Sequence, residues 1–198
     1  MTRATLLDGV IDYAAEHGLT DVSLRQIAAA LGTSHRMLIY HFGSKDELLL
    51  AVINEMERRQ LEQLEEFEAD PRVSPADEMR RMWRRLSDPK VWPHERLFFE
   101  VYGQALQGRP HATPLLETAV SSWLDPLTAA GQYIGRPRRE ARALARLGLA
   151  VVRGLLLDLL ATGDRRGCND AMEQFIASFP LTATTHRAGA ASRRAPGG

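Results

Sequence analysis

Cysteine is almost absent from this sequence: Cys168 is the single thiol among 198 residues. One thiol cannot form a disulfide within the chain, and it leaves no pair of cysteines with a zinc-ligand spacing. This scarcity favours a cytoplasmic protein. We expect Cys168 to be an inert residue near the start of a helix, with a sensor thiol as the alternative.

Long apolar runs are also missing. The longest one, around residues 155–157, is interrupted by Arg153 and Asp158, and a membrane-spanning helix needs ~20 apolar residues. Charged residues interrupt the N-terminal segment in the same way, so no signal peptide is expected. We therefore expect a cytoplasmic protein without a membrane partner.

No excess of positive charge is present either. The 25 Lys and Arg residues balance 25 Asp and Glu residues, which excludes a non-specific nucleic-acid coat but leaves a local patch possible. In residues 1–46 the basic side chains are Arg3, Arg25, Arg36 and Lys45, against Asp8, Asp12, Glu16, Asp21 and Asp46. A positive face must therefore come from the arrangement of these side chains and not from their number.

Sequence signatures of common enzymes are missing as well. There is no Glu-x-x-His pair for a di-iron bundle, no phosphate-binding loop and no nucleophile elbow. We expect no catalytic residues, no metal and no cofactor.

Residues 20–48 carry the most informative pattern in the chain. Ser23 and Gln26 have capping-box spacing, and an apolar face follows with a period of three and four residues. Gly32 then closes the helix, and Ser34 is placed to cap a second helix. That second helix has Leu38 and Phe42 directed inward, and Ser44 and Glu47 form a further capping box that opens a long helix. Two short helices around a tight turn predict a helix-turn-helix, with a polar helical hairpin as the alternative.

The residues in this segment resemble the TetR family of transcriptional regulators. The shared positions are Val22-Ser23-Leu24-Arg25, Ile27-Ala28, Gly32, Ser34, Leu38, His41-Phe42, Ser44-Lys45 and Leu48. Thr33 and Ile39 depart from the family pattern, which usually has Val and Tyr there. The Ile39 departure removes a frequent phosphate contact, and Tyr40 is the candidate to replace it.

The resemblance implies a DNA-binding surface built on the second helix of the motif. Its residues would be Arg25, Ser34, His35, Arg36, Met37, Tyr40, His41 and Lys45. Arg36 is the candidate for guanine, because a guanidinium can bond O6 and N7 together. Ser34 caps the helix, and Tyr40, His41 and Lys45 would hold phosphates, although His41 could instead pack on the core of the motif.

The pattern of the whole chain predicts an all-α protein of about nine helices. We expect a three-helix DNA-binding domain over residues 1–46, a helical effector-binding and dimerisation domain over 47–180, and a disordered basic tail over 181–198. The helices expected after the motif are a long one from residue 45 to near 70, then others opening at Ser74, Pro93 and Thr113, and at residues 137–162 and 168–179. Pro126 is expected to kink or break the one that opens at Thr113.

Two further surfaces are expected in the second domain. The resemblance implies an effector cavity, for which the aromatic and methionine candidates are Met79, Met82, Trp83, Phe98, Phe99, Tyr102 and Trp123, with Glu100 and Gln104 for polarity. The alternative is that these side chains are core. The expected dimer surface is a four-helix bundle made by Ala145, Gly148, Leu149, Val152, Leu156, Met172, Phe175, Ile176 and Phe179. Its alternative is that residues 137–162 form the core of the monomer.

Together these features favour a ligand-responsive regulator. The resemblance implies a repressor that binds a palindromic double-stranded DNA operator as a homodimer and is released by a small hydrophobic effector. The alternatives are a helical protein-interaction module and a small helical-bundle enzyme, neither of which would bind DNA.

Overall fold

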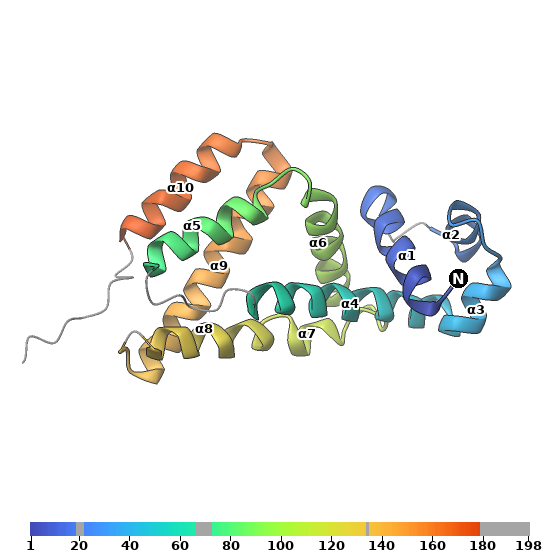
Figure 1. The fold of residues 1–198 in the computed structure, drawn as a ribbon, viewed down its shortest axis with the longest axis horizontal. Helices are drawn as coiled ribbons and strands as arrows, with labels where there is room; N and C mark the ends of the chain where they lie inside the picture. The colour runs from blue at the N-terminus through green and yellow to red at the C-terminus, as the bar shows by residue number, and fades with distance from the viewer. Residues whose placement is uncertain (19–21, 66–72, 134, 179–198) are drawn as a thin grey trace, which may run out of the picture.

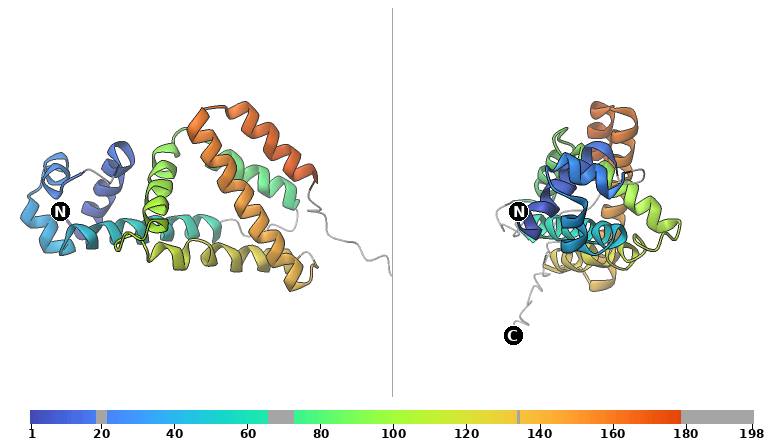
Figure 2. Two further views of the ribbon diagram at one scale, coloured as in Figure 1. Left: turned by 180° about the vertical axis from the view of Figure 1, so that it is seen from behind. Right: turned by 90° about the vertical axis from the view of Figure 1, so that its right-hand side faces the viewer.

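The computed structural model describes residues 1–18, 22–65, 73–133 and 135–178, and all regular structure in these ranges is helical. Figures 1 and 2 show an elongated molecule with α2 and α3 at one end and α5, α9 and α10 at the other. The helices are α1 (Arg3–His17), α2 (Leu24–Ala30), α3 (His35–Phe42), α4 (Lys45–Glu65), α5 (Pro75–Leu86), α6 (Trp92–Leu106), α7 (Leu115–Thr118), α8 (Ser121–Tyr133), α9 (Arg138–Thr162) and α10 (Arg165–Ser178). The expected all-α class is confirmed.

The three N-terminal helices begin at hydroxyl caps. Thr2 caps α1, Ser34 caps α3, and Ser23 forms the predicted capping box with Gln26 at the start of α2. Each cap satisfies backbone N–H groups that a helix start leaves without partners. The starts of these helices are therefore determined by local chemistry.

The turn between α2 and α3 depends on Gly32. Its φ is +65°, in the left-handed region where a side chain is strained, and no atom lies within 4 Å of the position that a Cβ would occupy. The glycine is needed for backbone conformation and not for space. This turn sets the angle between α2 and α3.

Helix α4 joins the N-terminal helices to the rest of the chain. Its apolar face is buried at Leu48, Leu49, Val52, Ile53 and Met56. These side chains belong to one core that begins at α1 and extends through α6 to α7. The hydrophobic core is therefore continuous across the predicted boundary at residue 46, and the division into domains remains a prediction. The predicted tail, residues 181–198, lies outside the described residues.

Pro126 does not break its helix, so that one of its two expected effects was wrong. The helical chain is interrupted at residues 119 and 120, between α7 and α8, and Pro126 lies inside α8. A proline inside a helix removes one i→i−4 hydrogen bond, and its ring crowds the carbonyl of the preceding turn. Helix α8 also packs along α9, where a Cβ on Gly131 would lie 2.9 Å from Ala141 Cβ. This close tertiary packing holds α8 together across the proline.

A second core lies at the far end, between α5, α9 and α10. It contains Trp83, Val152, Leu156, Leu159, Cys168, Met172 and Ile176. The Trp83 Nε1–H donates to Asn169 Oδ1 at 2.7 Å, which satisfies the one polar group of the buried ring. Helix α10 begins at Arg165, three residues before its predicted start, so Cys168 lies in its first turn and is buried.

Substituting Gly32 by alanine should lower the free energy of unfolding by about 1 kcal/mol, because alanine is strained at a positive φ. Gly103 inside α6 is the matched control: no atom lies within 4 Å of its Cβ position either, but its backbone is helical. Gly103→Ala should raise the free energy of unfolding by about 0.5–1 kcal/mol. Urea denaturation measures both, and equal effects of the two substitutions would contradict the conformational argument.

Candidate nucleic-acid interface

Helix α3 exposes a continuous set of side chains at the end of the molecule. Ser34 Oγ accepts the N–H of Met37 at 3.1 Å and starts the helix. Leu38 and Phe42 are buried, at 0% and 7% exposure, and this fixes the rotation of the helix about its axis. The side chains left outside are His35, Arg36, Met37, Ile39 and Tyr40, and Tyr40 is 80% exposed. Helix α3 is thus held from behind and free in front.

One edge of this surface is formed by His41. The His41 ring is half-buried and lies 5.1 Å from the Tyr40 ring in an edge-to-face arrangement. Arg3 joins them from α1: its Nε–H donates to the His41 carbonyl at 3.4 Å, and its guanidinium lies 5.0 Å from the centre of the Phe42 ring. His41 is therefore partly packed and partly exposed, so both of its expected roles, phosphate contact and packing on the motif, remain predictions.

Arg3 was counted as a basic residue in the sequence but not assigned to the site. Nothing in the local pattern places a residue at the start of α1 beside the end of α3, 38 positions later. The only feature of the sequence that could have indicated a role for Arg3 at this site was its positive charge.

Two more basic side chains flank α3. Arg25 is exposed in the first turn of α2, and Lys45, half-buried, is the first residue of α4. Ser44 Oγ accepts the N–H of Glu47 at 3.1 Å, which is one of the two bonds of the predicted capping box. The start of α4 is thereby fixed next to the end of α3.

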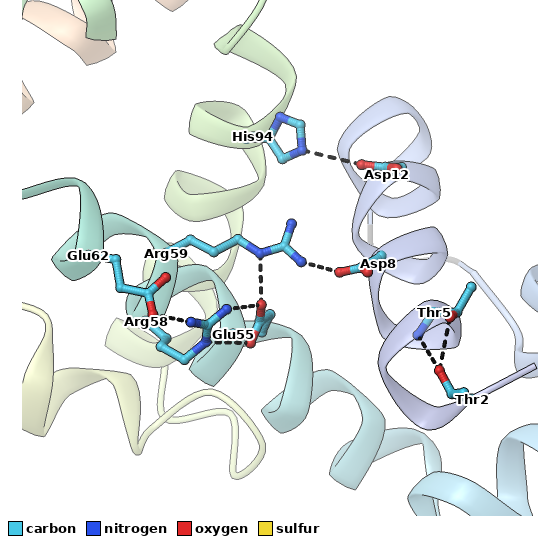
Figure 3. Close-up of polar contacts among 9 residues, drawn as sticks. All are labelled: Thr2, Thr5, Asp8, Asp12, Glu55, Arg58, Arg59, Glu62 and His94. Carbon is cyan, nitrogen blue, oxygen red and sulfur yellow. Dashed lines mark hydrogen bonds and ion pairs between the residues drawn. The ribbon is translucent and has the colours of Figure 1, made fainter. Parts of the chain in front are cut away.

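Three acidic side chains of residues 1–46 contact groups of later elements. On α1, Asp8 pairs with Arg59 of α4, and Asp12 lies 3.6 Å from His94 of α6, as Figure 3 shows. Asp46 lies 3.8 Å from His111, in the segment after α6. These three carboxylates therefore pair on the side of α4 and α6. Part of the acidic charge of residues 1–46 is thus directed toward later elements of the chain.

A charged cluster on α4 holds Arg59 in place for Asp8. Glu55 accepts hydrogen bonds from Arg58 Nε at 2.9 Å and from Arg59 Nε at 2.8 Å (Figure 3). These bonds, with that from Arg58 the stronger influence, lower the pKa of Glu55 to about 2. Glu55 thus orients the guanidinium that connects α4 to α1.

The predicted effector residues divide between the two cores. Met79, Met82 and Trp83 pack in the core of α5, α9 and α10, while Phe98 and Tyr102 belong to the core of α4 and α6. Phe99 contacts both cores, and Trp123 is half-buried on α8. Trp83 and Phe98 are only 4% and 7% exposed, which agrees with the alternative that they are core residues.

A buried polar cluster beside Phe98 and Tyr102 was missed. Glu57 of α4 accepts the Thr118 hydroxyl at 2.7 Å, and Glu95 of α6 is 7% exposed. Arg153 of α9 donates to the Ala119 carbonyl. Burial raises the pKa of both carboxyl groups, that of Glu95 to about 7, and lowers the pKa of Arg153. In the sequence Arg153 was noted only because it interrupts an apolar run. A charged residue in such a run could have indicated a buried polar site.

The predicted dimer surface needs correction. Ala145, Gly148, Val152, Leu156, Met172 and Ile176 are buried within the single chain. Leu149 and Phe175 are half-buried, and Phe179 lies outside the described residues. The apolar face of α9 is covered by other elements of its own chain, including α5 and α10. This agrees with the alternative that residues 137–162 form the core of the monomer.

Metal ligands do not gather in the described residues, where no group of three or more His, Cys, Asp or Glu side chains could hold an ion. Among the helices that the structure describes, none is long and apolar enough to cross a membrane.

This geometry defines a helix-turn-helix protein with a helical second part, and known proteins share both features. Residues 6–52 match the family model of bacterial regulatory proteins of the tetR family. The HTH-type transcriptional repressor AcnR of Corynebacterium efficiens is 34% identical over 65 residues, which are 33% of this chain and 35% of that protein. That match therefore spans about a third of the relative.

Two solved structures share the fold over most of the chain. A transcriptional regulator from Rhodococcus sp. Rha1 has a TM-score of 0.75 and 23% identity, covering 91% of this chain and 96% of that one. A transcriptional regulator from Saccharomonospora viridis, solved in complex with choline, has a TM-score of 0.66 and 25% identity, covering 90% and 94%. The N-terminal helices of the chain therefore match the tetR family model, and the fold of most of the chain is that of these regulators.

Glu55 should make the stability of the protein depend on pH in the acid range. Its pKa is about 2 in the folded protein against an ordinary 4.5, so its contribution is complete above about pH 5. It should be lost as the pH falls from 4.5 toward 2, because protonation breaks the bonds to Arg58 and Arg59. Glu55→Gln should therefore lower the free energy of unfolding at pH 7, and the difference from wild type should shrink below pH 4.5.

Urea denaturation between pH 7 and pH 3 measures this difference. Glu16→Gln, at an exposed carboxylate on α1, is the control and should differ little from wild type throughout. A Glu55→Gln difference that stays constant down to pH 3 would contradict the assignment.

Proposed function

We propose that this protein is a ligand-responsive transcriptional regulator that binds a palindromic DNA operator as a homodimer. The observation that carries the proposal is α3, whose inner side is buried and whose outer side presents Arg36, Met37 and Tyr40 without obstruction. The B-DNA major groove is wide enough to admit such a helix. The tetR family model and the match to a transcriptional repressor support a role in repression.

Each exposed side chain receives a role from its chemistry and position. Arg36 would bond the O6 and N7 atoms of guanine, with His35 and Met37 on neighbouring base edges. The candidates for phosphate contacts, which fix the register on DNA, are Arg3, Arg25, Tyr40, His41 and Lys45. Ser34 acts through its cap on α3. Arg3 extends the set because its guanidinium lies beside the end of α3.

Arg36→Ala should weaken specific operator binding roughly thirtyfold or more. Each lost bidentate contact is worth ~1–3 kcal/mol, and a dimer loses two of them. Operator sequences are first selected from random DNA with the wild-type protein, and affinity is then measured by fluorescence anisotropy at a fixed salt concentration, because salt alone changes it strongly.

The matched control is Arg96→Ala, which removes an exposed arginine from α6, away from α3. It should leave operator affinity within about twofold of wild type, since it removes no phosphate or base contact. Unchanged affinity of Arg36→Ala at matched salt, with the dimer intact, would refute the assignment of α3 and favour a protein-interaction module.

We place the dimer contact on the outer face of α9 and not on the buried face. The exposed residues there are Ala143, Leu147, Ala150, Gly154, Leu157 and Ala161. They alternate at spacings of four and three, which is the heptad pattern of a helix–helix seam. The small residues allow close approach, and Leu147 and Leu157 are 47% and 53% exposed in the single chain. A second copy related by a two-fold axis would cover both leucines.

Leu147→Glu should raise the dimer dissociation constant by roughly a hundredfold or more. Two buried leucine side chains are lost, each worth ~1.5–3 kcal/mol, and two carboxylates would face one another across the axis. Sedimentation equilibrium measures the constant. Leu106→Glu is the control, because Leu106 is 66% exposed at the end of α6, outside the stripe. A dimer equally stable in both variants would place the contact elsewhere.

The second part of the chain is proposed to bind a small hydrophobic effector. A regulator of similar fold was solved in complex with choline, which supports the binding of a small molecule by this chain. Effector binding would then move α6 against α1, through the contact of His94 with Asp12, and α4 against α1, through Arg59 and Asp8. Both contacts bear on the helices that position α3, so ligand and DNA binding would be coupled. A cytoplasmic location is part of the proposal, because the operator lies there.

A further inference from the structure

Among the described residues, the buried carboxylate of Glu95 has Arg153 as a charged neighbour but forms no direct bond to it. The side chain is 7% exposed on α6, and no hydrogen bond or ion pair to it occurs in the part of the chain that the structure describes. An isolated buried carboxylate is costly, and it is retained where something pairs with its charge. The small exposed remainder of Glu95 is the side from which a positively charged group would have to approach.

A pair of aromatic rings next to Glu95 already holds a cation. The Phe98 and Tyr102 rings are stacked with centroids 5.7 Å apart and planes 11° from parallel. The Arg153 guanidinium lies 5.3 Å from the Phe98 centroid and 5.7 Å from the Tyr102 centroid. Aromatic faces attract cations at such distances. The chain itself thus shows that this position suits a positive charge.

The cluster contains more acidic than basic side chains. Glu57 and Glu95 face a single guanidinium, that of Arg153, which donates to the Ala119 carbonyl and makes no ion pair with either carboxylate within the described residues. The Thr118 hydroxyl bonds Glu57, and Glu95 receives no such bond. A ligand that brings positive charge would balance the cluster, whereas an anion would face two carboxylates and two electron-rich ring faces.

We propose that this cluster is the effector site and that the effector is a lipophilic organic cation, an amine or quaternary ammonium compound. Its charged group takes the place of the Arg153 guanidinium over Phe98 and Tyr102 and pairs with Glu95. Arg153 is half-buried, so the displaced guanidinium can reach solvent. The inference rests on the proposed function in taking the second part of the chain as the effector-binding part.

The position of the cluster connects it to the DNA-binding helices. Glu95 is adjacent in sequence to His94, which faces Asp12 of α1, and Glu57 lies two residues before Arg59, which pairs with Asp8. A cation that draws Glu95 toward itself therefore pulls on α6 at its contact with α1 (Figure 3). One binding event can thus act on both connections to the N-terminal helices.

Isothermal titration calorimetry of the full chain at pH 8.5 tests the proposal with three probes of similar size. These are benzyltrimethylammonium, phenylacetate and benzyl alcohol, which carry a positive, a negative and no charge. The cation should bind saturably and at least tenfold more tightly than the other two. Its affinity should fall as the pH drops below about 7, where Glu95 becomes protonated.

Two variants separate a cation site from an anion site. Glu95→Gln should weaken cation binding more than tenfold, while Arg153→Met should strengthen it roughly tenfold by freeing the ring faces. Glu117→Gln, at an exposed carboxylate on α7, should change nothing. Circular dichroism checks that each variant is folded, and Glu95→Gln should fold at least as stably, because it removes a buried charge.

Three outcomes would overturn the proposal. They are the absence of saturable cation binding at millimolar concentration, unchanged cation affinity in Glu95→Gln, and tighter binding of phenylacetate that Arg153→Met abolishes. The last would make Arg153 an anion receptor. Operator binding is measured without any ligand, so a failure to bind DNA would refute the proposed function and leave the titration result unaffected. A failure of cation binding would refute this inference and leave the DNA-binding result unaffected.

Discussion

The buried face of α4 is the constraint on which the remaining structure depends. Leu48 and Val52 have no exposed surface, and they pack in one core with α1, α3 and α6. Because this core is close-packed, a shift of α4 must be accommodated by its neighbours. The helix that begins directly behind α3 therefore also belongs to the interior of the second part. The two parts of the chain are therefore joined by one shared hydrophobic core.

Polar contacts also join the N-terminal helices to the later elements of the chain. Asp8, Asp12 and Asp46 each meet a basic group or histidine from outside the first three helices. Exposed ion pairs of this kind contribute little to stability. Their consequence is geometric, because they direct these three carboxylates toward α4, α6 and the segment that follows α6.

Buried charge marks the region where the second part of the chain departs from a plain helical bundle. Glu95, Glu57 and Arg153 converge from α6, α4 and α9, and burial disfavours the charged form of all three. A bundle built for stability alone would place apolar side chains there, since buried ion clusters often stabilise less than apolar packing of equal volume. This departure is the basis of the effector site proposed above.

The sequence by itself determined what depends on neighbours along the chain. The caps at Ser23, Ser34 and Ser74, the left-handed glycine at position 32 and the inward direction of Leu38 all follow from contacts within a few residues. The tertiary structure alone decided which element covers each apolar face. Periodicity predicted that Val152 and Leu156 are buried, but only the packing of α5 and α10 on α9 shows that they lie inside the monomer. The same holds for Arg3 beside α3 and Arg153 over two rings. Those contacts join residues far apart in the chain, and helical periodicity carries no information about which helices meet.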